Sequence, residues 1–198
     1  MSPPGWITAA AVGPVLTGSR PPPDRITRFA RFPPPKASVQ WMVTRPHLRT
    51  WNGNHGKRLP IAHYECGYPI HVIVCTRARR AAFLASELAT ATFDLIVSSP
   101  CTMAACLMPD HLHWLVVGEN EPFSALVGRF KSVSTRIAWR YGHDGKLWQR
   151  SYFDHVVRRS ESCRRVAQYI VENPVRAGLV ADWCEYPHSV LFEERCPF

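Results

Sequence analysis

The stretch TMAACLMPDHLHWLVV, residues 102–117, decides the fold. It holds two apolar runs of strand length, and the Pro109-Asp110 pair between them is typical of a tight turn. The stretch therefore predicts a β-hairpin, with one strand at 102–108 and the next at 111–117. Everything else in the fold can be placed outward from this hairpin.

The flanking segments alternate between strand and helix patterns. We expect a strand at 70–76, a helix at 81–97, a helix at 122–140, a strand at 147–159, and a helix capped by Ser160 that ends at Asn173 because Pro174 cannot continue it. This order predicts an α+β fold: a ferredoxin-like or RRM-like split βαβ sandwich with an antiparallel sheet and an added C-terminal helix.

The first 60 residues differ from the rest of the chain. Residues 1–60 hold 11 of the 18 prolines and nine basic residues against the single acid Asp24. Such a composition predicts a disordered basic arm, although a start codon assigned too far upstream would give similar sequence. We expect one domain at 61–192, followed by a short tail at 193–198, because 198 residues can bury one moderate core.

Composition narrows the class of protein. The 24 lysines and arginines exceed the 15 acids and give a net charge of +9, which favours phosphate-bearing partners; anionic membrane surfaces and plain solubility are the alternatives. The seven cysteines are scattered without a Cys-x-x-Cys pair, which argues against a disulfide framework or a thiolate zinc site. With no apolar run of membrane-spanning length, we expect a cytoplasmic protein that makes no membrane contact.

Two pairs of side chains could carry chemistry. His111 and His113 lie two apart on one strand, so their imidazoles point to the same face and could clamp a metal ion; two packed or hydrogen-bonded histidines are the alternative. Tyr169 and Asn173 lie four apart on the last helix and therefore share a face. A boundary tyrosine and a C-terminal cap are the alternatives for this second pair.

Four motifs carry a resemblance to a known family. They are LMPDHLHWLVV (107–117), RFKSVSTRI (129–137), LWQRSYFDHVVR (147–158) and YIVENPVRAGLV (169–180). In this order they resemble the HUH single-tyrosine transposases, most closely the REP-associated tyrosine transposases, over residues 61–192. The run YPIHVIVCT is a loose version of that family's first strand, and residues 1–60 have no counterpart in it.

The resemblance implies a site and a reaction. His111 and His113 would hold a divalent cation, Mg²⁺ or Mn²⁺, Asn173 would complete the metal site, and Tyr169 would be the nucleophile. Paired imidazoles alone would suit Zn²⁺ or Ni²⁺ as well. The expected function is DNA transposition by metal-dependent cleavage and rejoining of single-stranded or hairpin DNA, through a 5′-phosphotyrosine intermediate.

A one-sided charge supports this class of substrate. Residues 123–165 contain ten basic residues against three acids. We expect backbone phosphates to bind Arg129, Lys131 and Arg136, with Arg150 and Arg158 on the same basic surface. Trp148, Tyr152 and Phe153 are candidates for stacking on unpaired bases, with ordinary core packing as the alternative.

Two other functions remain open at this level. One is a catalytically inactive or domesticated protein that binds single-stranded nucleic acid, and the other is a small metallohydrolase that does not act on DNA. The family resemblance is compatible with a monomer and with a homodimer that shares its active sites.

Overall fold

The predicted hairpin is confirmed. The computed structural model describes residues 67–117, 122–158 and 162–196, and in it strand β2 (Thr102–Met108) pairs antiparallel with β3 (His111–Val116). Met108 lies opposite His111 across the turn. The register shifts once, between Thr102 and Ala104, near the far end of the hairpin.

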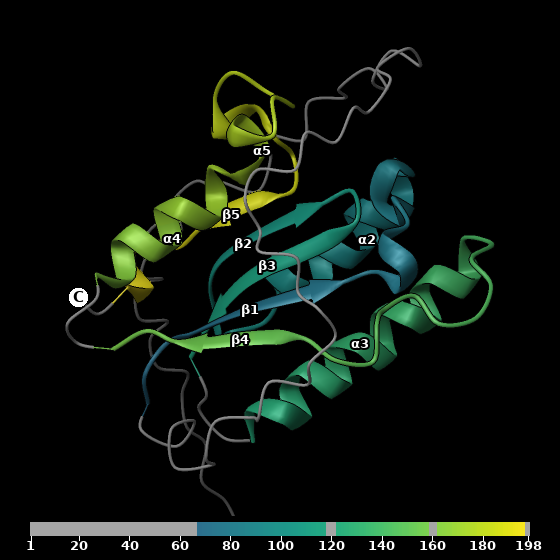
Figure 1. Cartoon of the computed structure of the whole chain (residues 1–198), viewed down its shortest axis with the longest axis horizontal. Helices are drawn as coiled ribbons and strands as arrows, with labels where there is room; N and C mark the ends of the chain where they lie inside the picture. The colour runs from purple at the N-terminus through teal and green to yellow at the C-terminus, as the bar shows by residue number, and fades with distance from the viewer. Residues whose placement is uncertain (1–66, 118–121, 159–161, 197–198) are drawn as a thin grey trace, which may run out of the picture. The chain divides into compact units, whose positions relative to one another are not determined.

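The hairpin is the centre of a five-stranded antiparallel sheet, which makes the fold α+β (Figure 1). The strand order is β4-β1-β3-β2-β5. The other three strands are β1 (Ile70–Cys75), β4 (Phe153–Val156) and β5 (Ser189–Leu191), and β4 and β5 form the two edges. The prediction of a first strand at 70–76 is thereby confirmed. The three-residue β5 was not predicted, because so short a segment has no measurable periodicity.

The strand predicted at 147–159 is mostly wrong. Only Phe153–Val156 pairs with β1, and the preceding residues touch the sheet through a single bridge between Thr76 and Trp148. Trp148 turns into the core at this point, where it is 4% exposed. The alternation of aromatic and polar residues over 147–159 therefore does not mark one long strand. It reflects a buried anchor, Trp148, followed by the short edge strand β4.

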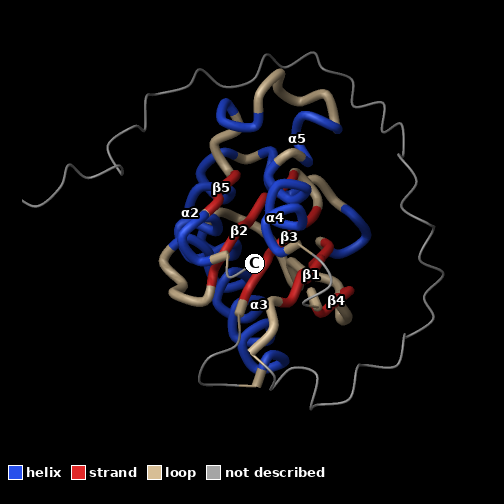
Figure 2. The backbone as a smooth tube through the Cα atoms, turned by 90° about the vertical axis from the view of Figure 1, so that its left-hand side faces the viewer, coloured by secondary structure: helices blue, strands red, loops and turns tan. Residues whose placement is uncertain are grey.

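Helices cover both faces of the sheet (Figures 1 and 2). Helices α2 (Ser86–Val97) and α3 (Phe123–Arg140) share one hydrophobic core with Val72, Val74 and Trp114. Helix α4 (Cys163–Val171) shares a second core with Cys106 and Leu115 on the opposite face. Alternate residues of β2 and β3 thus belong to different cores, as the two-residue period of a strand requires.

The remaining elements are short. They are the 3-10 helices η1 (Arg77–Arg79), η2 (Ala82–Leu84), η3 (Trp183–Glu185) and η4 (Glu193–Arg195), and helix α5 (Asn173–Arg176). The helix predicted at 81–97 is thus two elements, because Ala85 between η2 and α2 has extended backbone angles. The buried ring of Phe83 packs against Trp148 and holds η2 out of the helical path.

Both ends of the last predicted helix differ from expectation. The cap is Ser162, whose hydroxyl accepts a hydrogen bond from the backbone N–H of Arg165, whereas Ser160 lies outside the described residues. Helix α4 ends at Val171, and Pro174 lies in the first turn of α5. Proline suits that position because the first turn of a helix needs no donor from it. Pro174 therefore starts a new helix as well as ending the old one.

Some of the predictions fall on the margins of the structure. Residues 1–60 lie outside the described ranges. In the predicted tail, Arg195 donates to the carbonyl oxygen of Thr102, so residues 193–196 are packed on the domain. In the part of the chain that is described, no helix is long and apolar enough to cross a membrane. The six cysteines there are free thiols.

Candidate active site

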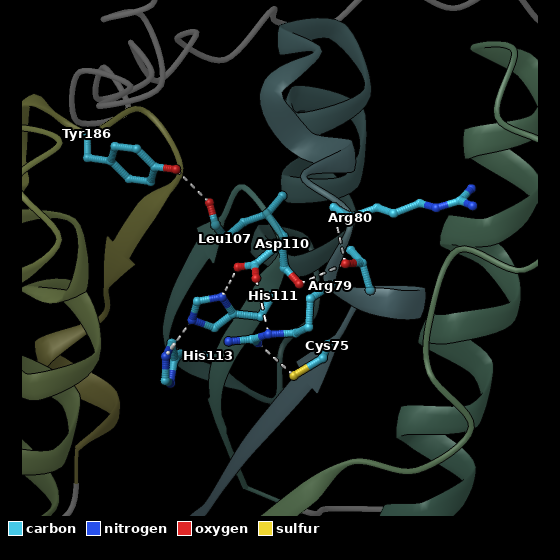
Figure 3. Close-up of polar contacts among 9 residues, drawn as sticks. Cys75, Arg79, Arg80, Leu107, Asp110, His111, His113 and Tyr186 are labelled. Atoms are coloured by element: carbon cyan, nitrogen blue, oxygen red, sulfur yellow. Dashed lines mark hydrogen bonds and ion pairs between the residues drawn. The ribbon is translucent and has the colours of Figure 1, made fainter. Parts of the chain in front are cut away.

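The two histidines of the hairpin lie side by side (Figure 3). The Nε2 atoms of His111 and His113 are 3.1 Å apart, and their rings meet at 72°. His113 is 2% exposed, and His111 is half-buried at the start of β3. Two neighbouring ligands of an octahedral cation at about 2.1 Å would be separated by about 3.0 Å. The observed spacing therefore fits two ligands of one metal ion.

Asp110 orients His111. Its Oδ1 lies 2.5 Å from Nδ1 of His111, and its Oδ2 lies 3.1 Å from Nε of Arg79. Burial opposes ionisation of this carboxyl group, but the hydrogen bond and charge of His111, together with Arg79, outweigh burial and lower the pKa of Asp110. An ionised Asp110 accepts the proton on Nδ1, which leaves the lone pair of the His111 Nε2 atom toward His113.

A third imidazole, which sequence reasoning missed, stands behind His113. His71 on β1 is buried, its ring stacks on His113, and its Nε2 lies 3.1 Å from the His113 Nδ1 atom. Burial, with a smaller contribution from His155, lowers the pKa of His71 to about 4. Burial and then the neighbouring His111 and His71 lower the pKa of His113 well below its usual value. Both rings are therefore neutral near pH 7, as metal ligation requires.

Tyr169 lies beside these histidines. Helix α4 carries it on the face toward the sheet, and its ring centroid is 6.4 Å from those of both His113 and His71. Tyr169 is 47% exposed, so a large part of it is accessible to solvent. The structure thus brings together the histidine pair and a tyrosine that lie more than 50 residues apart in the sequence.

Arg176 is a second residue that the sequence did not indicate. Its guanidinium carbon lies 4.0 Å from the centroid of the Tyr169 ring, which is a cation–π contact. The same guanidinium donates to the backbone carbonyl of Tyr169 and lies 3.5 Å from a carboxylate oxygen of Glu172. The guanidinium of Arg176, on α5, therefore packs on the ring of Tyr169.

Asn173 closes the end of α4. Its amide nitrogen donates to the carbonyl oxygens of Tyr169 at 3.1 Å and Ile170 at 2.9 Å, which is the capping role. These contacts engage only the nitrogen, so the amide oxygen keeps its lone pairs. Within residues 67–117, 122–158 and 162–196, no group of three His, Cys, Asp or Glu could hold a metal ion. A third protein ligand would therefore be a group such as this amide, and the metal role of Asn173 stays a prediction.

The predicted DNA-binding residues fall into two groups. Arg129, Arg136, Arg150 and Arg158 are exposed. Lys131 is half-buried, and its ammonium group donates to the carbonyl oxygens of Gln149 and Arg150. Lys131 therefore ties α3 to the segment before β4, which is a structural role beside the predicted phosphate contact.

The three aromatic candidates also differ. The prediction that Trp148 stacks on an unpaired base is wrong, because its side chain is buried and its Nε1 donates to the hydroxyl of Ser134 at 2.8 Å. Tyr152 is half-buried and packs against Phe123. Phe153 is 51% exposed, and it pairs with Ile73 just as His155 pairs with His71. Phe153 therefore lies on the histidine face of the sheet, where a base could stack.

Known proteins resemble this chain. A profile of the family described as "Transposase IS200 like" matches residues 64–173. A Haemophilus influenzae protein provisionally named a REP-associated tyrosine transposase is 30% identical over 101 residues, which are 44% of this chain and 57% of that protein. The REP-associated tyrosine transposase of Escherichia coli is 24% identical over 90 residues, 44% of this chain and 52% of that protein.

A solved structure is also similar. The structure of a REP-associated tyrosine transposase bound to a REP hairpin matches 62% of this chain and 76% of that chain, with 21% identity and a TM-score of 0.49. The chain spans little more than half the length of the two curated relatives. The family profile, however, covers more than half of this chain and runs from before β1 to Asn173. The chain belongs to the IS200-like transposase family.

Proposed function

We propose that this member of the family cleaves and rejoins single-stranded or hairpin DNA through Tyr169, with the help of a divalent cation. The observation that carries the proposal is the position of Tyr169 beside His111 and His113, which come from a distant hairpin. We also assign the strand order β4-β1-β3-β2, with α2 and α3 on one face, to the ferredoxin-like split βαβ fold. Strand β5 and helix α4 would be additions to it.

The chemistry of the ligands suits a phosphate-bound cation. The Nε2 atoms of His111 and His113 and the amide oxygen of Asn173 would hold Mg²⁺ or Mn²⁺. Bound there, the cation would withdraw charge from the scissile phosphate. All three ligands are neutral, so the positive charge would stay available to a phosphate. Asp110 would orient His111 and His71 would orient His113, so that the Nε2 atom of each ligand faces the cation.

The reaction balances as a transesterification. The Tyr169 oxygen attacks the phosphorus, a P–O bond to a 3′ oxygen breaks, and the phenol proton ends on that leaving oxygen. The products are a 5′-phosphotyrosine and a free 3′ hydroxyl, so attack by the 3′ hydroxyl of another strand reverses the step without ATP. Arg176 would keep the phenol in place during attack. Phe153 would stack on an unpaired base near the site.

The test is a covalent adduct. Purified protein is incubated with a labelled hairpin oligonucleotide that carries single-stranded flanks, with Mg²⁺, with Mn²⁺ or with a chelator, and adducts are separated on a denaturing gel. We expect an adduct only with a divalent cation, and none with Tyr169→Phe, which should bind the oligonucleotide as the wild type does. Binding without an adduct under every metal condition would instead indicate an inactive DNA-binding protein.

A further inference from the structure

A cavity of about 290 Å³ lies outside the candidate active site. It opens where η1, at the end of β1, meets the loop after α3. Its charged and titratable lining residues are Arg77, Arg80, His143, Asp144 and Lys146. Neither the histidine pair nor Tyr169 contributes to it, and none of the predicted DNA-binding residues does.

The charges of this cavity are unbalanced. Three cationic side chains, those of Arg77, Arg80 and Lys146, face one carboxylate, that of Asp144. No ion pair or side-chain hydrogen bond joins any of the three cations to another residue in the described ranges. Like charges gathered around one concavity repel each other and lower the energy of a bound anion.

His143 adds an unused polar atom. Its Nε2 is buried and has no hydrogen-bond partner among the described residues. The backbone of His143 is fixed, because its N–H donates to the carbonyl oxygen of Ala138. A buried ring nitrogen without a partner is unfavourable unless a ligand or a water supplies one. An anion held by the three cations could accept a hydrogen bond from this imidazole.

The turn that forms the cavity also reaches the candidate active site. Ala78 and Arg79 have positive φ values of 56° and 55°, a conformation that side chains with a Cβ rarely adopt. Arg79 points to Asp110, which orients His111, while the side chain of Arg80 extends away from the imidazole pair (Figure 3). Neighbouring residues of one strained turn thus contact the active site on one side and line the cavity on the other.

We propose that this cavity binds a phosphate of the DNA strand whose scissile phosphate lies at Tyr169. This inference rests on the proposed function for the identity of the strand. Guanidinium groups form paired hydrogen bonds to phosphate oxygens, and Lys146 adds a point charge. The cavity volume of about 290 Å³ is close to the lower limit of ordinary ligand pockets, which is roughly 300 Å³. The cavity can therefore hold about one nucleotide but not a duplex. It would fix the register of the strand relative to Tyr169.

The first test is the salt dependence of DNA binding, measured by fluorescence anisotropy with a labelled single-stranded oligonucleotide and the full chain. Each phosphate contact to a single strand contributes about 0.7 to the slope of log affinity against log salt. We expect Arg80→Ala and Lys146→Ala each to lower the magnitude of the slope by about that amount. The matched control is Arg164→Ala, which removes the same charge from an exposed position on α4. Far-UV circular dichroism checks that each variant is folded.

The second test locates the phosphate. Single phosphates of the oligonucleotide are replaced, one at a time, by neutral methylphosphonates. Replacement at one position should weaken binding to the wild type and to Arg164→Ala. The same replacement should have no effect on Lys146→Ala, because the contact is already lost. His143→Gln, which keeps a donor, should bind better than His143→Ala.

Three results would overturn the inference. In the first, Arg80→Ala and Lys146→Ala match Arg164→Ala in slope and in the methylphosphonate scan, while the metal-dependent adduct at Tyr169 still forms. That result would leave the proposed function intact. In the second, deoxyadenosine monophosphate binds the wild type but not Lys146→Ala, and no methylphosphonate replacement changes oligonucleotide binding. The cavity would then be a site for a free nucleotide. In the third, the wild type binds no oligonucleotide, and the proposed function fails as well.

Discussion

The Nε2 atom of His71 lies 3.1 Å from the Nδ1 atom of His113 on the neighbouring strand, and the two rings are stacked. If the buried His71 accepts the proton on this nitrogen, the other nitrogen of His113, Nε2, keeps its lone pair and faces His111. A residue that sequence reasoning overlooked would then decide which tautomer the candidate metal ligand adopts.

This relationship predicts the metal affinity of His71 variants. His71→Phe keeps an aromatic ring but loses the acceptor, and we expect Mn²⁺ affinity to fall roughly 10- to 100-fold, as is usual for residues that orient a metal ligand. His71→Gln, whose amide oxygen can accept the same hydrogen bond, should lose less. Isothermal titration calorimetry with Mn²⁺ in the absence of DNA measures both. Equal affinity of His71→Phe and the wild type would refute the orienting role.

Arg176 should affect the rate of adduct formation more than DNA binding. Its guanidinium covers the Tyr169 ring at 4.0 Å, and a cation–π contact of this kind contributes about 0.5–2 kcal/mol. Arg176→Ala should therefore slow adduct formation by roughly 2- to 30-fold. Arg176→Lys, which can keep a cation over the ring, should be closer to the wild type. The measurement is the rate of adduct formation at saturating oligonucleotide; unchanged rates in both variants would contradict the prediction.

Trp148 and Phe153 offer a matched comparison of core and surface. Trp148 is 4% exposed, and Trp148→Ala should lower the free energy of unfolding by about 3–5 kcal/mol because it leaves a cavity. Phe153 is 51% exposed, so Phe153→Ala should change that free energy little. The same variant should weaken single-strand binding by about 1–3 kcal/mol if a base stacks on the ring. Urea unfolding and fluorescence anisotropy report the two effects separately.

These two residues also show where sequence reasoning was limited. Both belong to one segment of interleaved aromatic and basic residues, and a linear pattern cannot show which ring turns into the core. In contrast, the histidine pair was predictable, because a spacing of two on a strand puts side chains on one face whatever the rest of the fold does. The hairpin and α3 were predictable for the same reason, because the spacing of apolar residues that identifies a strand or a helix lies within the segment itself.

The parts that were missed depend on contacts between distant segments. His71 sits within an apolar run, and only the pairing of β1 with β3 places it behind His113. Arg176 follows Pro174, which predicts only the end of a helix, and it reaches Tyr169 from α5, seven residues further along the chain. The cavity forms where η1 meets the loop after α3, and neither segment has a regular pattern. Sequence periodicity carries no information on such contacts.

Acid should destabilise the metal-free protein through two histidines, the buried His71 and the half-buried His188. Burial lowers the pKa of His71 and of His188 to about 4, whereas an unfolded chain has histidine pKa values of about 6.5. Between these values the unfolded chain binds protons that the folded protein does not, so stability is full above about pH 6.5 and is lost as the pH falls toward 4. Each group contributes up to about 1.4 kcal/mol per pH unit in that window.

His188 packs on Phe93, away from the imidazole pair, so His188→Gln isolates one such contribution. Urea unfolding in the presence of a chelator should give a flatter pH profile for this variant between pH 6.5 and 4, and the same profile above pH 7. Parallel profiles across the whole range would show that His188 is not neutral in the folded protein.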